Sequence, residues 1–533
     1  MPCDPISRSA LFERLQSTPQ FDIAIIGGGA TGLGIALDAA VRGFSVVLLE
    51  SHDFAKGTSS RATKLVHGGV RYLAQGNIGL VREALHERTT LLANAPHLAQ
   101  ALPFVMPSYA WWQTPFYGLG LKMYDLLAGK AGLGATEFLG KDAAIRLLPT
   151  LQPGGLAGGV KYWDGQFDDA RLALAIGKTA VQKGALLINY CAATGLLVED
   201  GKTVGLQAKD GETDTAYSVR ARCVVNAAGV WVDAFRKLDG EQLQRPVTPM
   251  VAPSQGVHLV VERSFLPTDH ALMVPKTADG RVLFAVPWLG KLILGTTDTP
   301  RHDLSREPSP FAHELEFILS EAGKYLTRAP QRSDVLSIWV GLRPLVKPVG
   351  DEGGNTKKLS REHTILVSKS GLLTVTGGKW TTYRAMAEDV LEHAFEAHLL
   401  EPRAGGVTVH LPLAGAPATS AVAAPHRICD APGLHLYGSE AAAVQALPGA
   451  EHELGGAGIS GLTEAMVRYA VRYEYARTVE DVLARRSRLL FLDARLAASL
   501  AAQVGAIVHS ETGVDPQTEA FTALAAHYTQ LPI

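Results

Sequence analysis

The fold is decided by the stretch FDIAIIGGGATG at residues 21–32. Its first six residues are mostly apolar and include three isoleucines, a composition typical of a buried parallel strand. Gly27, Gly29 and Gly32 follow with GxGxxG spacing, and the residues after them favour a helix. The stretch therefore predicts a strand, a tight glycine turn and a helix in direct succession, which is the start of an α/β unit.

The residues that follow complete this unit. Residues 45–49 form the next predicted strand, and Glu50 ends it 18 residues after Gly32. Gly27 permits the tight turn, Gly29 lets the backbone approach a pyrophosphate, and Gly32 lets helix and strand pack closely. The helix N-terminus offers N–H groups to the phosphates, and Glu50 can accept hydrogen bonds from a ribose. The unit predicts a dinucleotide site. The alternative is a glycine-rich turn without a ligand, and the unit alone does not distinguish FAD from NAD.

The composition is that of a large globular protein. The chain has 533 residues, of which 47% are hydrophobic and 19% charged, and its formal net charge is −2. At roughly 100–200 residues per domain, this length predicts two to four domains. The near-neutral charge argues against a nucleic-acid-binding surface. The four cysteines have neither CxxC nor metal-ligand spacing, so we expect no metal site, no disulfide framework and a reducing compartment. They are Cys3, Cys191, Cys223 and Cys429.

Neither a signal peptide nor a membrane-crossing helix is expected. The first 20 residues carry charges and lack an apolar core. Residues 21–41 are largely apolar, but Asp22, Asp38 and five glycines interrupt them. A transmembrane helix needs ~20 continuous apolar residues, and no other segment of the sequence meets that requirement.

Three later segments favour a flavin as the cofactor. Residues 58–73, TSSRATKLVHGGVRYL, combine small hydroxyls, a lysine and a Gly-Gly pair, which suits backbone packed against a flat polar group. The alternative is a Ser/Thr-rich loop. Residues 223–229, CVVNAAG, predict a buried strand whose small end residues can abut a cofactor, with plain core packing as the alternative. Residues 372–384, LLTVTGGKWTTYR, predict a third strand-turn-helix unit, whose helix N-terminus suits negative charge on a flavin ring.

Several motifs occur in the order found in one enzyme family. They are residues 27–32, residues 58–73, GTTD at 295–298, GLRP at 341–344 and GGKWTTYR at 377–384. Together they resemble the FAD-dependent glycerol-3-phosphate dehydrogenases, within the D-amino-acid-oxidase-like superfamily. The resemblance is strong over roughly residues 20–400 and looser beyond. Val230 and Trp380 replace a proline and a leucine that are common in the family, and Trp380 could alter access to the flavin.

The resemblance implies an α/β protein of three parts. These are a Rossmann-like FAD-binding domain built from discontinuous segments, an antiparallel-sheet substrate domain of the D-amino-acid-oxidase type, and a C-terminal α-helical domain. Strand-like runs at 281–286 and 291–294 agree with the antiparallel sheet, and Ala-rich segments with helical spacing follow a loop that starts at residue 402. The expected boundaries are 20–90, 160–235 and 346–400 for the FAD domain, 91–159 and 236–345 for the substrate (cap) domain, and 410–533 for the helical domain.

The residues expected to hold FAD lie in the motifs already quoted. They are Gly27, Gly29, Gly32, Glu50, Thr58, Ser59, Ser60, Lys64, His67, Gly68, Ala228, Gly229, Gly378, Lys379 and Thr381.

The family reaction implies the rest of the site. Glycerol 3-phosphate is oxidised to dihydroxyacetone phosphate by hydride transfer from C2 to flavin N5, and the electrons pass to a membrane quinone. Arginine suits the phosphate, because its planar fork pairs with two oxygens at once. The expected substrate contacts are Arg71, Tyr72, Thr296, Arg343 and Arg361. Lys379 is expected near the flavin and the substrate oxygens.

His258 is the expected general base, so that the catalytic group is His258, Arg343 and Lys379. An imidazole titrates near neutral pH and can take the proton of the C2 hydroxyl. His258 lies between apolar neighbours, so a core histidine is the alternative. His67 is a second candidate, and cations around the alcohol could also ease its deprotonation without a dedicated base.

The remaining expectations concern the membrane and partners. Residues 111–127 are aromatic-rich and flanked by lysines, so they could lie in a membrane interface, or form a buried helix under the substrate domain. The resemblance implies peripheral attachment to the cytoplasmic face of the inner membrane. We also hypothesise a homodimer.

Other functions stay open at this point. A related oxidase would use the same substrate and pass its electrons to oxygen. An amino-acid or amine oxidase of the same superfamily would bind a carboxylate with Arg343. Two alternatives belong to other functional classes. They are a flavin-bound regulator without turnover and a dehydrogenase that uses NAD alone.

Overall fold

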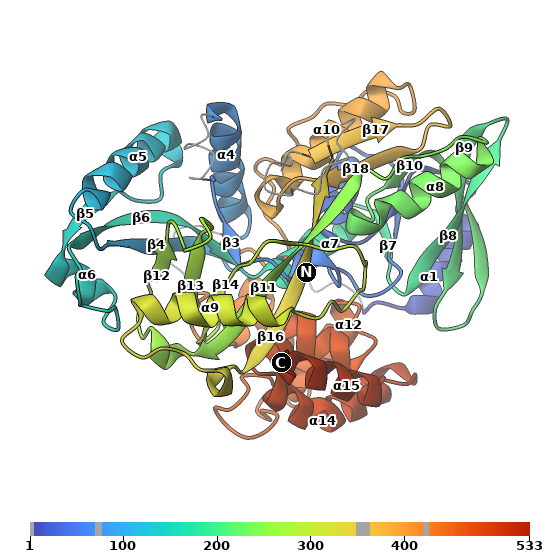
Figure 1. The fold of residues 1–533 in the computed structure, drawn as a ribbon. Helices are drawn as coiled ribbons and strands as arrows, with labels where there is room; N and C mark the ends of the chain where they lie inside the picture. Colours follow the sequence, from blue (N-terminus) through green and yellow to red (C-terminus); the bar gives the residue numbers. More distant parts are fainter. Residues whose placement is uncertain (1–4, 70–76, 348–362, 419–425) are drawn as a thin grey trace.

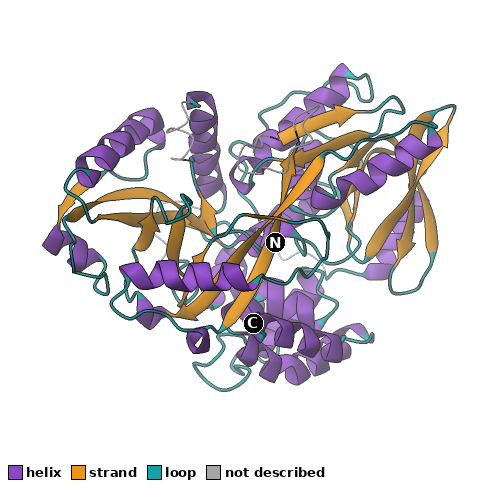
Figure 2. Ribbon diagram, in the orientation of Figure 1, coloured by secondary structure: helices purple, strands orange, loops and turns teal. Residues whose placement is uncertain are grey.

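The computed structural model describes residues 5–69, 77–347, 363–418 and 426–533. Within these ranges the strands form two sheets, one of eight strands and one of ten. The C-terminal helices lie below the region where the two sheets meet (Figure 1, Figure 2). This arrangement confirms the predicted fold class.

The first sheet is parallel at its centre and contains the strand that opens the glycine turn. β1 (Phe21–Ile26) pairs in parallel with β2 (Val46–Leu49) on one side and β10 (Ala216–Asn226) on the other. β7 (Leu186–Ile188) and β18 (Leu373–Gly377) extend the parallel part. Because this centre is covered on both faces, its strands are continuous apolar runs. The remaining strands of this sheet are β8 (Cys191–Glu199), β9 (Lys202–Asp210) and β17 (His363–Val367).

Helices cover this sheet. α2 (Ala30–Val41) starts directly at the glycine turn, three residues before the predicted start, and it packs between α7 (Asp169–Gln182) and α10 (Tyr383–Glu396). α1 (Arg8–Ser17) and α8 (Val232–Gln242) pack against other strands of the same sheet.

The second sheet is largely antiparallel. β11 (Val251–Glu262) pairs with β16 (Ser337–Val346), and β4 (Ala99–Ser108) pairs with β6 (Gly158–Phe167), each over ten residue pairs. Its other strands are β3 (Leu65–Val66), β5 (Glu137–Gly140), β12 (Ala271–Val274), β13 (Leu283–Trp288), β14 (Lys291–Gly295) and β15 (Thr299–Pro300). The helices around it are α4 (Ile78–Asn94), α5 (Gln113–Ala128), α6 (Lys141–Leu147) and α9 (Ala312–Tyr325).

Two strands of the expected FAD segments pair in the second sheet. The expected FAD segments 20–90 and 160–235 include β3 and β6, yet β3 pairs with β6 and β6 pairs with β4 in the second sheet. A short strand pairs with whichever strand offers it free hydrogen-bonding groups. The local sequence does not indicate to which sheet that partner strand belongs. The division of the rest of the chain into three domains stays our interpretation.

The C-terminal part is helical, as predicted. Its helices are α11 (Ala441–Gln445), α12 (Glu464–Tyr473), α13 (Leu489–Leu492), α14 (Ala494–Thr512) and α15 (Thr518–Thr529). α13 and α15 pack against β16. The helical part therefore shares one apolar core with the second sheet.

A buried group of charges joins the helical part to the first sheet. Arg485 and Arg486 both form ion pairs with Asp53, and Arg488 Nη2 lies 2.9 Å from Asp169 Oδ1. These side chains are almost fully buried. We refer to Arg485, Arg486, Arg488 and their carboxylate partners as the arginine cluster. Buried charges depend on their partners, so the cluster fixes how the helical part sits on the first sheet.

Candidate active site

The glycine turn has the geometry that its sequence predicts. Gly27 has a φ of +105°, and a Cβ there would lie 2.7 Å from the carbonyl oxygen of Ala227, so only glycine fits. A Cβ at Gly32 would lie 1.9 Å from the carbonyl oxygen of Gly27, so Gly32 is what lets α2 pack on β1. At Gly29, which precedes α2, a Cβ would meet only Ser59 Oγ, at 3.1 Å. The N-terminus of α2 is therefore open toward the cavity beside it.

That cavity has a volume of about 320 Å³, and we call it the nucleotide cavity. The predicted cofactor residues that line it are Gly27, Gly29, Glu50, Thr58, Ser59, Ala228, Gly229, Gly378 and Lys379. Glu50 accepts hydrogen bonds from the backbone N–H of Gly28 at 2.7 Å and of His52 at 2.9 Å. These bonds hold its carboxylate at the end of β2, where a ribose is expected.

A second cavity of about 360 Å³, the substrate cavity, lies between the two sheets. The residues that line both cavities are Thr58, Pro344, Gly377, Gly378, Lys379 and Trp380. The two spaces therefore meet at the turn after β18. An open helix N-terminus, a glycine cradle, a fixed carboxylate and a second cavity in line with them fit a dinucleotide whose ring system reaches the substrate, as FAD does.

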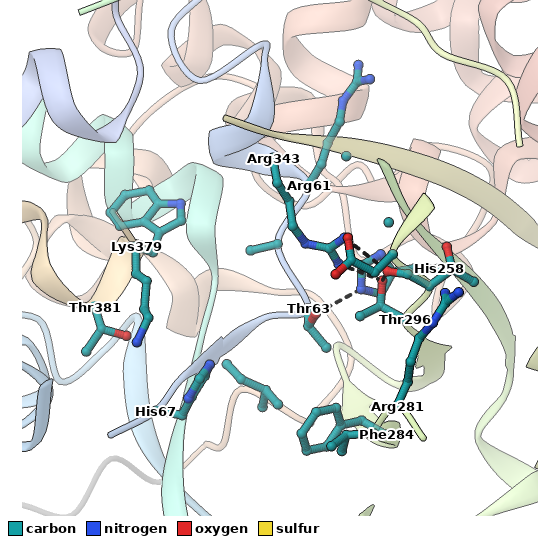
Figure 3. A pocket seen from close by; sticks show the side chains of 18 of the residues that line it. Arg61, Thr63, His67, His258, Arg281, Phe284, Thr296, Arg343, Lys379 and Thr381 are labelled. Carbon is teal, nitrogen blue, oxygen red and sulfur yellow. Dashed lines mark hydrogen bonds and ion pairs between the residues drawn. The ribbon is translucent and has the colours of Figure 1, made fainter. Parts of the chain in front are cut away.

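Arg343, on β16, is held on one side of the substrate cavity. Its Nη1 donates to the carbonyl oxygen of Thr297 at 3.0 Å, and its Nη2 donates to Thr296 Oγ1 at 3.1 Å. Asp298 lies 3.5 Å from the guanidinium. A Cβ at Gly256 would lie 2.2 Å from Nη2, so the glycine on neighbouring β11 makes room for the guanidinium. Arg343 and Thr296, both predicted, are thus brought together (Figure 3).

His258, on β11, lies beside them and is 2% exposed. Its Nε2 shares a hydrogen bond of 2.9 Å with Thr63 Oγ1, and its ring stacks on Trp339 with 4.2 Å between centroids. Burial, with the nearby charges of Arg343 and Lys64, holds the pKa of His258 well below its usual range. The imidazole is therefore neutral near pH 7.

Lys379, Thr381 and His67 lie on the other side of the substrate cavity in the view of Figure 3. Lys379 immediately follows the Gly377–Gly378 turn, so its position depends on the positive φ of both glycines. Trp380, the departure noted in the sequence, donates from Nε1 to the carbonyl oxygen of Ser59 at 2.9 Å. Its indole therefore forms part of the wall shared by the two cavities.

Comparison with known proteins agrees with this geometry. Residues 22–384 match the family model "FAD dependent oxidoreductase", and residues 407–519 match the "C-terminal domain of alpha-glycerophosphate oxidase". The mitochondrial glycerol-3-phosphate dehydrogenase of Mus musculus is 42% identical over 93% of this chain and 71% of its own length. The chain belongs to the FAD-dependent glycerol-3-phosphate dehydrogenase family.

Solved structures support the same family. The glycerol-3-phosphate dehydrogenase of Bacillus halodurans, solved with FAD, is 30% identical, with a TM-score of 0.76 over 99% of this chain and 98% of that one. The L-alpha-glycerophosphate oxidase of Mycoplasma pneumoniae, with a TM-score of 0.55, is 17% identical over 70% of this chain and 94% of that one, and it shows the shared fold alone. The cofactor of this dehydrogenase family member is FAD, as predicted.

Three predicted cofactor residues do not line either cavity, so their contact with FAD stays a prediction. Ser60, Lys64 and Gly68 are buried away from both cavities of the described structure. Lys64 Nζ lies 2.7 Å from Asp169 Oδ2 and beneath the ring of Trp339, and burial lowers the pKa of its ammonium to about 7. The side chain of Lys64 faces Asp169 and Phe491 of the helical part, and the local sequence does not indicate that direction. Gly32 also stays outside the cavities, but it has the packing role expected of it.

Three further predicted residues, Arg71, Tyr72 and Arg361, lie outside the described residues. Their assignment to the substrate stays a prediction from the family motifs.

The structure also adds residues that the sequence did not single out for this dehydrogenase. Thr63, which contacts His258, lies in the quoted motif next to Lys64, which was assigned to the cofactor. Arg281 lines the substrate cavity from the loop before β13, with its Nε 2.7 Å from Asp279. The nucleotide cavity gains Trp231 and Arg306. Of these residues, only Thr63 lies in a family motif that could have indicated it. Arg281 and Arg306 come from loops without a distinctive sequence pattern.

Proposed function

We propose that the enzyme oxidises sn-glycerol 3-phosphate to dihydroxyacetone phosphate and passes the electrons to a membrane quinone. One observation carries the proposal. The substrate cavity, with an anchored arginine on one side and Lys379 on the other, meets the nucleotide cavity at the Gly377–Trp380 turn.

Arg343 is the proposed phosphate contact. Its neighbours hold the guanidinium in one orientation, so little side-chain entropy is lost when a phosphate binds. Lys379 and Arg281, the latter paired with Asp279, are further cationic side chains of the same cavity. A phosphate dianion suits more than one cation, whereas a carboxylate needs one. This charge favours a phosphorylated polyol over an amino acid.

His258 is the proposed acceptor of the C2 hydroxyl proton. It lines the substrate cavity, its imidazole is neutral near pH 7, and Thr63 fixes one ring nitrogen. The bound FAD supplies the acceptor, at N5, for the hydride that leaves C2. Lys379 would hold a substrate oxygen close to the ring, and the shared wall of Trp380 would keep water away.

The surface of α5 supports the proposal that the enzyme contacts a membrane peripherally and reduces a quinone there. The buried-helix alternative for residues 111–127 does not hold. Trp112, Phe116, Leu119, Met123 and Leu126 are exposed, and their spacing of four and three residues puts them on one face of the helix. Lys122 is exposed beside them. An apolar helix face with adjacent lysine suits the interfacial region of a bilayer. None of the helices in the described ranges has the length and hydropathy to span a membrane.

The decisive experiment is anaerobic. Purified FAD-loaded enzyme is mixed with sn-glycerol 3-phosphate, and the visible flavin absorbance is followed. We expect bleaching with this substrate, none with amino acids, and rapid return of the absorbance with a short-chain quinone. Return with oxygen at the same rate, together with peroxide, would replace the quinone-linked assignment by an oxidase.

A further inference from the structure

The loop at residues 301–311, between β15 and α9, belongs to the second sheet but reaches the nucleotide cavity of the first. Arg306 lines that cavity, and its guanidinium lies 4.7 Å from the ring centroid of Trp231, another lining residue. Trp231 donates from Nε1 to the carbonyl oxygen of Leu304 at 3.1 Å. The loop is therefore fastened to the wall of the cavity at its middle.

Arg306 differs from Lys56, another cation of this cavity wall. Lys56 is neutralised by Glu480, with its Nζ 2.6 Å from the carboxylate. For Arg306, no carboxylate lies within ion-pair distance among the residues that the structure describes, and its charge faces Trp231 and the cavity. A diphosphate brings negative charge into this cavity, and an arginine guanidinium suits phosphate oxygens.

The next residue, Glu307, ties the loop to the rest of the molecule. Its carboxylate accepts from Arg61 Nη2 at 2.6 Å and from the hydroxyl of Tyr528 at 3.2 Å. Arg61 also donates from Nη1 to the carbonyl oxygen of Arg306 at 3.0 Å. Arg61 and Tyr528 are buried, so both contacts are shielded from solvent. Tyr528 belongs to α15, so the last helix of the chain reaches the loop that borders the FAD cavity.

We propose that Arg306 is an FAD-binding residue and that Glu307 and Tyr528 are its positioning residues, through which the C-terminal helical part controls how long FAD stays bound. The inference rests on the FAD assignment of the nucleotide cavity and extends it to a part of the chain that does not line that cavity in the described structure. Glu307 and Tyr528 act on FAD by holding the loop that carries Arg306, and Glu307 also lies 3.9 Å from Lys56 Nζ.

The test measures FAD release from the holoenzyme. Loaded protein is diluted, and the FAD that remains bound is measured by its visible absorbance after timed gel filtration. Arg306→Gln should release FAD about tenfold faster, because an ionic contact to phosphate is lost. Glu307→Gln and Tyr528→Phe should each release it about threefold faster, because the loop loses one anchoring hydrogen bond.

Matched controls separate this role from general destabilisation. Arg328→Gln removes an arginine that also lies over an aromatic ring, Phe265, but outside the cavity. Tyr469→Phe removes a buried tyrosine hydroxyl of the helical part that contacts Lys178 instead. Neither should change the release of FAD.

The double variant decides how the residues act. If Tyr528 works through Arg306, Tyr528→Phe adds nothing to the release rate of Arg306→Gln. The difference between wild type and Arg306→Gln should also shrink at high salt, because part of it is electrostatic. Unchanged release in Arg306→Gln, equal acceleration in the controls, or a full Tyr528→Phe effect in the Arg306→Gln background would overturn the proposal. Wild-type protein that takes up no FAD would instead end the proposed function itself.

Discussion

Arg343 is oriented by its neighbours before any substrate arrives. Thr296 and Thr297 take two of its donors, Asp298 lies nearby, and Gly256 leaves the space that the guanidinium needs. A side chain held in this way offers a fixed fork to an incoming phosphate. At the scale of single residues, the site therefore depends on a few contacts that can be changed one at a time.

The first prediction concerns that fork. Arg343→Lys keeps the charge but loses the paired donors, so kcat/KM for glycerol 3-phosphate should fall about 100-fold. Flavin reduction at varied substrate concentration measures it. Arg328→Lys, at an exposed position between α9 and β16, is the matched control. An unchanged substrate dependence in Arg343→Lys would remove Arg343 from the phosphate site.

The second prediction is a pH profile. Because the pKa of His258 is well below 6.5, its imidazole is already neutral at that pH, and the rate of flavin reduction should be flat from there to about pH 8. His258→Gln should lower that rate about 100-fold. The same depressed pKa means that stability from this residue is present above about pH 6.5 and lost as the pH falls below it. Stopped-flow reduction gives the first result, and thermal unfolding at several pH values gives the second. A rate that climbs through pH 7 with a single ionisation would contradict the assignment of His258.

The third prediction compares two glycines. A methyl at Gly32 would collide with the carbonyl oxygen of Gly27, so Gly32→Ala should purify without FAD or fail to fold. Gly120 on α5 has no atom within 4 Å of such a methyl among the described residues, so Gly120→Ala should keep its full FAD content. The ratio of flavin to protein absorbance decides. Normal flavin content in Gly32→Ala would be inconsistent with the close packing of α2 on β1.

At the scale of elements, α5 presents an apolar face to solvent while it packs on β6 with its other side. Buried residues such as Leu121 and Tyr124 alternate along the helix with exposed Leu119 and Leu126, which are 66% and 82% exposed. Exposed apolar side chains along one helix face indicate a surface that contacts another apolar phase, such as the interior of a bilayer. Such a helix can therefore fold with the enzyme and still leave a face for a bilayer.

The fourth prediction tests that face. The double variant Phe116→Ser and Leu126→Ser should bind anionic lipid vesicles at least tenfold more weakly, because about two buried side chains are lost from the interface. Ile459→Ser, an exposed apolar position on the helical part, is the control. Co-sedimentation with vesicles measures binding. Equal binding by the double variant and the control would exclude α5 as the contact.

Strands and helices that are determined by their own residues could be predicted from the sequence. Those that depend on pairing with distant residues could not. β1, β2 and α2 follow from apolar runs and glycines within residues 21–49, and β13 and β14 follow from their own apolar, strand-like runs. The sheet chosen by β3 could not be predicted, because it depends on pairing with β6 about a hundred residues later. The inward direction of Lys64 depends on Asp169 and the helical part in the same way.

At the scale of the whole molecule, the arginine cluster joins the two ends of the chain. Asp53 is buried and accepts from both Arg485 and Arg486, and these arginines hold the pKa of its carboxyl below the usual range. A carboxylate in this position stabilises the protein only while both partners are present.

The fifth prediction follows. Asp53→Asn should lower the free energy of unfolding by about 3–5 kcal/mol, because it leaves two arginines buried without their shared partner. Glu199→Gln breaks an exposed pair with Arg220 and should leave unfolding unchanged. Since the pKa of Asp53 is lowered in the folded protein, the stability that it provides should disappear as the pH falls through the acid range. Thermal unfolding at neutral and acid pH measures all three. An Asp53→Asn variant as stable as Glu199→Gln would show that the cluster does not hold the two parts together.

The arginine cluster also sets an order of events during synthesis. Asp53 leaves the ribosome 432 residues before Arg485, so the nascent first sheet carries a carboxylate whose burial must wait for nearly the entire remaining chain. Until then, this end of the sheet stays hydrated and open to proteases and chaperones. A message truncated before codon 485 should accordingly yield a product that the cell degrades, even though the glycine turn that cradles the dinucleotide is translated in full.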